Sequence, residues 1–477
     1  MGREIEGGHF SDADFAQFEQ ALGAETDRLT ALFADGALSA RHGCGGYELE
    51  AWLVGADERP APVNEAFLAG MPEGVATPEL SRFNFELGAP PREVTGAYFD
   101  AMHTELAANW QRCREVAAGL DAAPVMVGIL PTVTDAMLGM DNMARQARFQ
   151  ALNEQIMRQR HGRPLPLDIQ GYEFLHTEHR DVMLEAATTS FQLHLQVAAD
   201  QATRYFNAAV ALSGPMVGVS ANAPFLFGKR LWRETRIPLF EQAVAVGGFG
   251  GAAFGPVKRV TFGSGYVRRS LLELFQENRE HFPVLLPVGL DDPTETLPHL
   301  RLHNGTIWRW NRPLLGFDAD GTPHLRIEHR VVPSGPTVAD TVANAALFFG
   351  LVRALAEAET PPESVLEFAT ARENFYSAAK HGLDATQTWL DGRHWPLATL
   401  LRERLLPAAR EGLQAAGCAG ADIDHFLGII SERVRTRQTG AAWQIAHADA
   451  HGRDLPALVR AYRGHQDGGA PVHTWPV

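Results

Sequence analysis

Glu48 and Glu50 stand two residues apart in a stretch, residues 46–53, in which apolar and other side chains alternate. This alternation predicts a β-strand on which both carboxylates face one side, opposite Tyr47 and Leu49. Two like charges on one face repel each other, and burying them costs further free energy. A hard divalent cation bound by both carboxylates would remove that cost. The other interpretation of this stretch is the solvated outer face of an edge strand.

Two further alternating stretches, residues 80–87 and 188–197, also place polar side chains on one face. The polar residues are Arg82, Asn84 and Glu86 in the first stretch, and Ser190, Gln192, His194 and Gln196 in the second. A strand exposed on a bare surface more often carries Lys, Glu or Thr outward. The second stretch is therefore better suited to the wall of a wet cleft.

A pair of alternating stretches, residues 302–313 and 324–331, is joined by a short turn sequence at 318–321. This arrangement predicts an antiparallel hairpin. One face of the hairpin would carry Trp308, Trp310 and Arg312 from the first stretch, and Arg326, Glu328 and Arg330 from the second. Acidic and basic side chains thus alternate with apolar ones on the last predicted strand.

The acidic and imidazole side chains of these strands would share one face of a sheet: Glu48, Glu50, Glu86, His194 and Glu328. Four carboxylates and one imidazole suit Mg²⁺ or Mn²⁺ better than zinc, because oxygen ligands dominate and no thiolates converge. Arg312, Arg326 and Arg330 beside them indicate a ligand with negative charge of its own, such as a polyphosphate. Salt bridges from these arginines to the same acids are the alternative.

Helical patterns account for most of the remaining chain. They cover residues 11–33, 95–120, 145–160 and 202–212, and then 338–358, 364–379, 396–416, 422–437 and 442–463; a buried strand is predicted over 125–130. Strands of a parallel sheet buried on both sides would be unbroken apolar runs, unlike the strands predicted here. The sequence therefore predicts an α+β fold, in which helices cover the apolar face of a curved antiparallel sheet and a helical region follows.

The composition excludes several classes of protein. The chain has 477 residues and a formal net charge of −15, which argues against a nucleic-acid partner. Its three cysteines make neither a disulfide framework nor a metal-ligand spacing. Residues 1–10 are polar, unlike a secretory signal, and no apolar stretch reaches the roughly 20 residues that span a bilayer.

The glycine-rich residues 247–265 lack GxGxxG and P-loop motifs and predict a mobile loop. We expect a cytoplasmic protein with small-molecule partners and no membrane partner; a homo-oligomer is compatible with these features.

Several of these motifs together resemble the glutamate–cysteine ligase family of bacterial carboxylate–amine ligases, which share a fold with glutamine synthetase. The resemblance covers roughly residues 41–335. It is carried by Glu48-Leu49-Glu50, Asn84-Phe85-Glu86, the strand Thr189 to Val197 with His194, the turn Asn222-Ala223-Pro224-Phe225, Thr235-Arg236, Trp308 to Pro313, and Arg326 to Arg330. It implies a glutamine synthetase-like catalytic domain over 1–345 with a sheet of about six strands, and a helical C-terminal region over 346–477 packed on it.

The resemblance also implies a reaction, the ATP-dependent formation of an amide bond, in which γ-glutamyl transfer proceeds through an acyl phosphate. ATP would be the co-substrate and Mg²⁺ or Mn²⁺ the cofactor, held by the acidic face. The implied catalytic residues are Arg330 and Arg312; the implied ATP contacts are Arg330, Arg326 and Gln196; and the implied substrate contacts are Arg236, Arg148, Arg233, Gln192, Asn304 and Trp308. Ala223 replaces the usual serine, and the tryptophan-containing hairpin is not a close match. Both departures bear on which amino acid and which amine are used.

Three other functions remain open. A guanidino kinase has a related sheet and would need a reactive cysteine, for which Cys44 is the candidate. A metal-dependent amidohydrolase would be expected to carry closely spaced histidine ligands such as His-x-His, which the chain lacks. A non-catalytic ATP- or metal-binding protein of the same fold is the third. Nucleotide consumption that depends on an added amino acid separates the ligase from all three.

Overall fold

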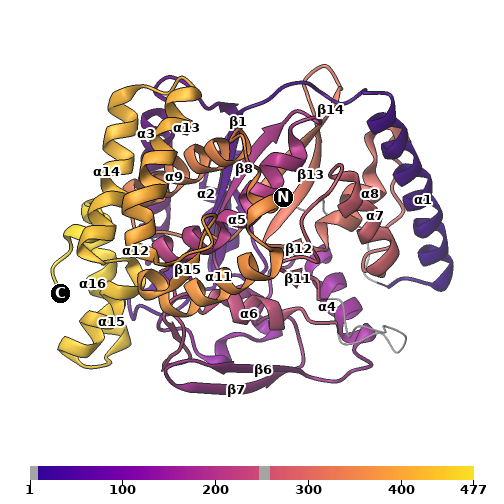
Figure 1. Cartoon of the computed structure of the whole chain (residues 1–477). Coiled ribbons are helices and arrows are strands. Elements are labelled where there is room, and N and C mark those ends of the chain that lie inside the picture. Colours follow the sequence, from indigo (N-terminus) through magenta and orange to yellow (C-terminus); the bar gives the residue numbers. More distant parts are fainter. Residues whose placement is uncertain (1–8, 247–257) are drawn as a thin grey trace.

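The structure is a computed structural model that describes residues 9–246 and 258–477. Figure 1 shows a central sheet flanked by helices, with the C-terminal helices stacked along the left side. A two-stranded hairpin, β6 Leu165–Gln170 and β7 Phe174–His179, lies at the bottom of the view. Residues 247–257 of the predicted glycine-rich loop and residues 1–8 of the predicted polar N-terminus lie outside the described residues.

An antiparallel sheet forms the centre, with six strands in the spatial order β13, β14, β8, β1, β3 and β2. Their bounds are β1 Cys44–Gly55, β2 Ala76–Pro78, β3 Asn84–Gly88, β8 Phe191–Val197, β13 Asn311–Phe317 and β14 Pro323–His329. Two short strands, β4 Arg92–Glu93 and β5 Ala122–Val125, also pair with β1. The predicted α+β fold with a curved antiparallel sheet of about six strands is confirmed.

Strand pairing brings the predicted site residues into one row across the sheet. The directly paired residues are Glu50 with Glu86, Glu48 with Gln192, His194 with Glu328, and Glu328 with Arg312. Directly opposed residues project to the same face of a sheet. Their period-two spacing along each strand therefore places side chains from β3, β1, β8, β14 and β13 on one face.

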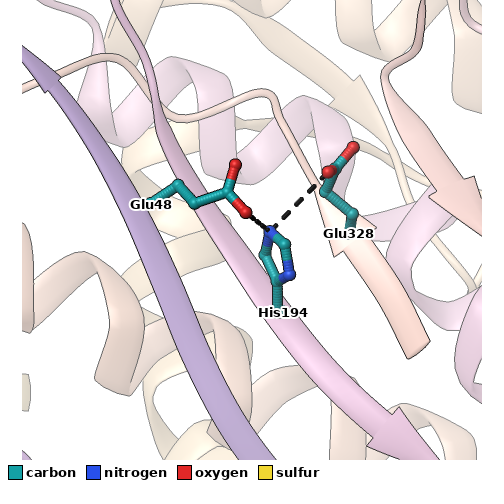
Figure 2. Close-up of side chains that lie close together, drawn as sticks. All are labelled: Glu48, His194 and Glu328. Carbon is teal, nitrogen blue, oxygen red and sulfur yellow. Dashed lines mark ion pairs between the residues drawn. The ribbon is translucent and has the colours of Figure 1, made fainter. Parts of the chain in front are cut away.

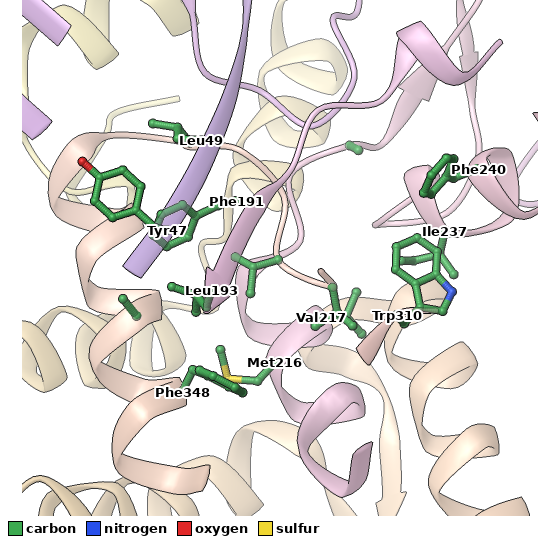
Figure 3. Packing of buried hydrophobic residues seen from close by; sticks show 14 of the residues in the cluster. Tyr47, Leu49, Phe191, Leu193, Met216, Val217, Ile237, Phe240, Trp310 and Phe348 are labelled. Carbon is green, nitrogen blue, oxygen red and sulfur yellow. The ribbon is translucent and has the colours of Figure 1, made fainter. Parts of the chain in front are cut away.

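The opposite, apolar face packs on two long buried helices, α5 Ala202–Ser220 and α9 Val338–Ala356. Figure 3 shows Leu193 of β8 facing Met216 of α5 and Phe348 of α9. These three side chains and Leu49 of β1 are fully buried, and burying one such side chain contributes about 1.5–3 kcal/mol. Because this packing covers the apolar face, the polar side chains lie on the opposite face of the sheet.

Helix α9 is the one helix among the described residues that is long and apolar enough to cross a membrane. Inside the protein, however, 83% of its most apolar window is buried. Its burial against α5 and the sheet is that of a core helix.

Shorter helices lie on the polar side of the sheet. They are α4 Ala147–Gln159, α7 Leu272–His281 and α8 Pro298–Gly305. Helix α1, Asp12–Ala34, packs along α7 and α8 (Figure 1). It begins with a capping box, in which Ser11 and Asp14 bond each other's backbone N–H, and this cap satisfies N–H groups that lack a partner in the first turn. These helices close the space in front of the polar face.

The C-terminal helices are bonded to the sheet region through Asn222. Its side-chain amide donates to the backbone oxygen of Ser334 and to the hydroxyl of Tyr462, each at 2.8 Å. The side chain of Gln444 in turn donates to Asn222 Oδ1 at 3.0 Å. The predicted division at residue 345 falls inside α9 and remains a prediction.

The remaining elements are the 21-residue helix α3, several short elements and the helices of the C-terminal region. They are α2 Asn64–Gly70, α3 Tyr98–Ala118, β6 Leu165–Gln170, β7 Phe174–His179, β9 Phe225–Leu226, β10 Lys229–Arg230, α6 Arg236–Ala243, β11 Val260–Thr261, β12 Trp308–Arg309, α10 Pro362–Val365, α11 Phe368–His381, β15 Thr386–Thr388, β16 His394–Pro396, α12 Leu397–Leu400 continued by a π-turn to α13 Leu406–Ala415, α14 Gly420–Thr436, α15 Gly440–His451 and α16 Leu455–Gly468.

Four predicted elements differ from the structure. The predicted strand over 302–313 is helical as far as Gly305, because Pro298 starts α8 at a position that tolerates proline. The helix predicted to end before Pro215 continues to Ser220, since complete burial outweighs the missing hydrogen bond. The predicted helix over 442–463 is broken at Gly452, which adopts a φ of 80°. Of the strand predicted over 125–130, β5 contains Val125 alone.

Candidate active site

A cavity of about 420 Å³ opens on the polar face of the sheet, enclosed by α4, α7, α8 and the segment before β8. Of the residues predicted from the sequence to form a site, Glu48, Glu50, Glu86, Gln192, Arg312, Arg326, Arg330, Arg148, Asn304 and Trp308 line it. The far wall is largely apolar and includes Phe275, Leu286 and Leu302. The cavity thus has a charged wall made by strands and an apolar wall made by helices.

Glu48, His194 and Glu328, hereafter the Glu328 cluster, lie together on β1, β8 and β14. Figure 2 shows the imidazole between the two carboxylates. His194 Nε2 lies 3.1 Å from Glu48 Oε1 and 3.6 Å from Glu328 Oε1. All three side chains are buried, so their charges interact with little screening by water.

Two arginines balance the charge of the Glu328 cluster. Arg312 donates to both carboxylate oxygens of Glu328, from Nε at 2.8 Å and from a terminal nitrogen at 2.9 Å. Arg330 donates to the same carboxylate at 3.0 Å. Burial alone would raise the pKa of Glu328, but Arg312, Arg330 and His194 outweigh it and hold that pKa well below its ordinary value. The pKa of Glu48 is lowered too, because His194 outweighs the effect of its burial.

Glu50, Glu79 and Glu86, hereafter the Glu86 cluster, form a second group whose oxygens lie within 4.8 Å of one another. Arg312 and Arg330, which hold Glu328, form no ion pair with Glu50 or Glu79 among the described residues. Burial, followed by the neighbouring charge of Glu79, raises the pKa of Glu50 to about 7. Burial and the charges of Glu48 and Glu79 raise the pKa of Glu86 well above its ordinary value. The carboxyls of Glu50 and Glu86 therefore hold protons more tightly here than they would in water.

Gln192 bonds to both clusters. Its amide nitrogen donates to Glu50 Oε1 at 2.7 Å, and its amide oxygen accepts from the guanidinium of Arg330. The other oxygen of Glu50 accepts the backbone N–H of Ser190 at 2.6 Å. One side chain thus links Glu50 to Arg330, the arginine that pairs with Glu328.

The two clusters fit divalent cations by their donor chemistry. They offer five carboxylates and one imidazole, which suit Mg²⁺ or Mn²⁺. The buried Nε2 of His194 has no hydrogen-bond partner of acceptable geometry, although Glu48 is near. A buried polar atom without a partner costs free energy, which a bound cation would recover. Glu328 and Glu48 offer oxygens beside that nitrogen.

Six residues predicted for the site do not line the cavity. His194 and Glu328 adjoin Glu48 in the Glu328 cluster, and the other four lie elsewhere. Arg236 is buried, pairs with Glu234 at 3.1 Å, and donates to the backbone oxygens of Arg330 and Val331. Its guanidinium is thus occupied by the protein, and this placement does not support a substrate contact. The others are Arg233, which pairs with Asp384; Gln196, which donates to Asp318; and Trp310, which packs in the core with Phe240 and Phe375.

Three acids that line the cavity were not predicted from the sequence: Glu79, Glu185 and Asp292. Glu79 directly precedes the alternating stretch that contains Glu86, so its position beside a ligand strand was the available signal. Glu185 lies in a short 3₁₀ turn, Glu185–Ala187. No periodic pattern marks a side chain in such a turn.

Comparison with known proteins identifies relatives by family and by fold. The family model of glutamate-cysteine ligase family 2 matches residues 45–468. Among solved structures, a glutamate–cysteine ligase from Francisella tularensis in complex with AMP aligns at a TM-score of 0.55 and 12% identity, covering 90% of each chain. A bifunctional glutathione synthetase from Pasteurella multocida aligns at a TM-score of 0.47 and 11% identity over 92% of this chain and 54% of that one. No curated protein matched this sequence.

Proposed function

Because the chain belongs to glutamate-cysteine ligase family 2, we propose that it is an ATP- and Mg²⁺-dependent carboxylate–amine ligase that forms a γ-glutamyl amide through an acyl phosphate. One observation carries the proposal: four carboxylates and three arginines, Arg312, Arg326 and Arg330, line a single cavity. The carboxylates are Glu48, Glu50, Glu79 and Glu86, and Glu328 and His194 adjoin Glu48. Acids that hold cations, next to arginines that hold phosphate oxygens, are the components that phosphoryl transfer requires.

In this proposal the Glu328 and Glu86 clusters hold the cations, which would neutralise negative charge on the phosphates of ATP. Arg330 and Arg312 project into the same cavity and stabilise charge on the phosphoryl oxygens as the group moves to the substrate carboxylate. Arg326, whose Nε has no hydrogen-bond partner of its own, lies near Glu48 and Glu328 and contacts the polyphosphate. These roles divide the charged wall between cation binding and anion binding.

The amino-acid substrate would lie toward α4 and α8. Arg148 of α4 and Asn304 of α8 line that part of the cavity together with Trp308. Arg148 is suited to hold a carboxylate because guanidinium and carboxylate match in geometry. Arg236 acts at a distance in this proposal, since its bonds to the backbone oxygens of Arg330 and Val331 position Arg330.

The proposal is tested by trapping the activated carboxylate. Glutamate, ATP, Mg²⁺ and hydroxylamine at high concentration should give a hydroxamate and ADP, because hydroxylamine is a small strong nucleophile that needs few contacts. Oxygen-18 in the γ-carboxylate should appear in the released phosphate. AMP and pyrophosphate as products would contradict the acyl phosphate. Release of ADP without any carboxylate would favour a kinase or an ATPase.

The guanidino-kinase alternative needs a reactive thiol at the site. Cys44 does not line the cavity among the residues the structure describes. Burial, followed by the charge of Glu93, raises the pKa of its thiol. A thiol with a raised pKa is a poor nucleophile near neutral pH. The ligase therefore has support at this site that the kinase lacks.

A further inference from the structure

Glu185 is a cavity-lining acid that neither cluster includes. It opens the short 3₁₀ turn Glu185–Ala187 that leads into β8. Its carboxyl contributes to the lining beside Glu50, Glu79 and Arg330. It does not belong to either group of acids whose oxygens converge within 4.8 Å. It therefore faces the reaction space without being one of the converging ligands.

The Glu185 carboxyl has no hydrogen bond and no ion pair with any described residue. Glu50, by contrast, accepts from Ser190 and Gln192, and Glu328 accepts from two arginines. A carboxyl that is enclosed in a cavity and left without a donor loses the hydration of its charged form. Such a carboxyl is open to a donor supplied by a ligand.

The surroundings of Glu185 combine apolar side chains with negative charge. Val182, one turn earlier, lines the cavity, and its backbone N–H donates to the side chain of Asn153 in α4 at 3.1 Å. Phe149 and Leu152 of that helix line the cavity as well. Burial, followed by the charges of Glu79 and Glu50, raises the pKa of Glu185 well above its ordinary value, against the opposing charge of Arg330. Apolar walls with net negative charge favour a cation with an organic body.

We propose, on the basis of the ligase function proposed above, that Glu185 binds the amine substrate as its ammonium ion and accepts the proton that must leave before the amine can attack. An ammonium ion has no lone pair, so an amide cannot form until one N–H bond breaks. The nitrogen then attacks the acyl carbon, and the bond from that carbon to the phosphate oxygen breaks. Of the three ammonium hydrogens, one passes to Glu185, one leaves with phosphate, and one stays on the amide.

This role distinguishes protonated amines from hydroxylamine. Hydroxylamine is a weak base and is largely unprotonated at neutral pH, so it needs no proton acceptor before attack. Methylamine and the common amino acids are ammonium ions at that pH. A variant without the Glu185 carboxylate should therefore fail with methylamine or an amino acid while it still forms a hydroxamate.

The test compares Glu185→Gln with wild-type protein using glutamate, ATP and Mg²⁺ at pH 7. In Glu185→Gln, the kcat of amide formation should fall by about 10²–10⁴-fold with methylamine and with each amino acid used as the amine. This is the usual contribution of general acid–base catalysis. The rate of hydroxamate formation should stay within about threefold, since loss of the proton acceptor leaves a pre-deprotonated nucleophile unaffected. Amide formation by the variant should also rise by about tenfold per pH unit, as the fraction of free amine grows.

Glu178→Gln is the matched control, because Glu178 lies on the exposed side of β7, outside the cavity, and carries the same charge. It should behave as wild type with every nucleophile. Melting curves of both variants separate loss of folding from loss of chemistry. Equal loss of amide and hydroxamate in Glu185→Gln, or no loss of either, would overturn the role of Glu185. So would a wild-type protein that forms a hydroxamate but no amide with any protonated amine. Absence of hydroxamate in the wild-type protein would instead overturn the ligase function itself.

Discussion

The Glu328 cluster and the Glu86 cluster hold the same kind of side chain on neighbouring strands, yet their charges are balanced in opposite ways. Arg312 and Arg330 offset Glu328, and the pKa values of Glu48 and Glu328 are lowered. In the Glu86 cluster the pKa values of Glu50 and Glu86 are raised. Adjacent arginines therefore lower the pKa of Glu328, whereas burial and neighbouring carboxylates raise the pKa values of Glu50 and Glu86.

The largest effect that would test this contrast is on stability. Glu328→Gln should lower the free energy of unfolding by about 3–5 kcal/mol, because it leaves two buried guanidinium groups without their counter-charge. Glu86→Gln should leave stability unchanged or raise it, since it relieves repulsion among crowded acids. Urea unfolding of both variants without divalent cations measures the difference. Equal destabilisation of the two variants would end the contrast.

The free energy of unfolding also depends on pH through a histidine that belongs to neither cluster. This dependence must be measured before the clusters are compared at different pH values. Burial lowers the pKa of His303, outside both clusters, to about 4. In the unfolded chain the imidazole of His303 has a pKa of about 6.5. The free energy of unfolding therefore has its full value above pH 6.5 and falls as the pH drops toward 4. The loss between pH 7 and 4.5 should be about 2–3 kcal/mol. In His303→Phe, the free energy of unfolding measured with urea should lose most of its dependence on pH in this range. An unchanged dependence would mean that other groups cause it.

Cation binding should separate the clusters without an activity assay. Mg²⁺ at a hundredfold excess over its dissociation constant should stabilise the wild-type protein by about 2.7 kcal/mol. In Glu86→Gln this increment should shrink, while the stability without Mg²⁺ is kept. Glu328→Gln should be less stable than the wild-type protein both with and without Mg²⁺. Thermal melts with Mg²⁺, with NaCl of matched ionic strength as the control, measure both quantities. An undiminished increment in Glu86→Gln would remove that cluster from cation binding.

The smallest effect concerns the bridge between the clusters. Gln192→Met keeps a similar side-chain length but removes the hydrogen bonds to Glu50 and Arg330. We expect a loss of about 1–2 kcal/mol, as for hydrogen bonds to charged groups that remain partly hydrated through the cavity. A double-mutant cycle with Glu86→Gln should then show an interaction energy. Strictly additive effects would mean that the two clusters are energetically independent.

The sheet and its polar face could be predicted because both follow from alternation along the strand. A residue such as Glu48 or His194 is assigned to a face by its position relative to apolar neighbours, and that rule holds for every strand of the sheet. The structure places Glu48, Glu50, Glu86, His194 and Glu328 on one face as predicted. Their roles as ligands remain proposals.

The features that could not be predicted depend on contacts between residues that are far apart in the sequence. The pattern around Arg236 does not reveal that Glu234 and two backbone oxygens occupy its guanidinium. Glu185 lies in a turn without periodicity, so nothing in the local sequence shows that it reaches the cavity. Pro215 would end a solvated helix, and only the packing around α5 keeps it in one. Each case is decided by neighbours that are remote in the sequence.

The hydrogen bond between Gln192 and Arg330 joins residues that are 138 positions apart. Strand β8 leaves the ribosome long before β14, and during synthesis at about 5–20 residues per second it waits several seconds for its partner. Until then Gln192, which bonds to Glu50, lacks its partner Arg330. Order of synthesis therefore imposes order of assembly: the row of charged side chains across the sheet is completed only after β14, the last strand of the sheet in the sequence, has docked.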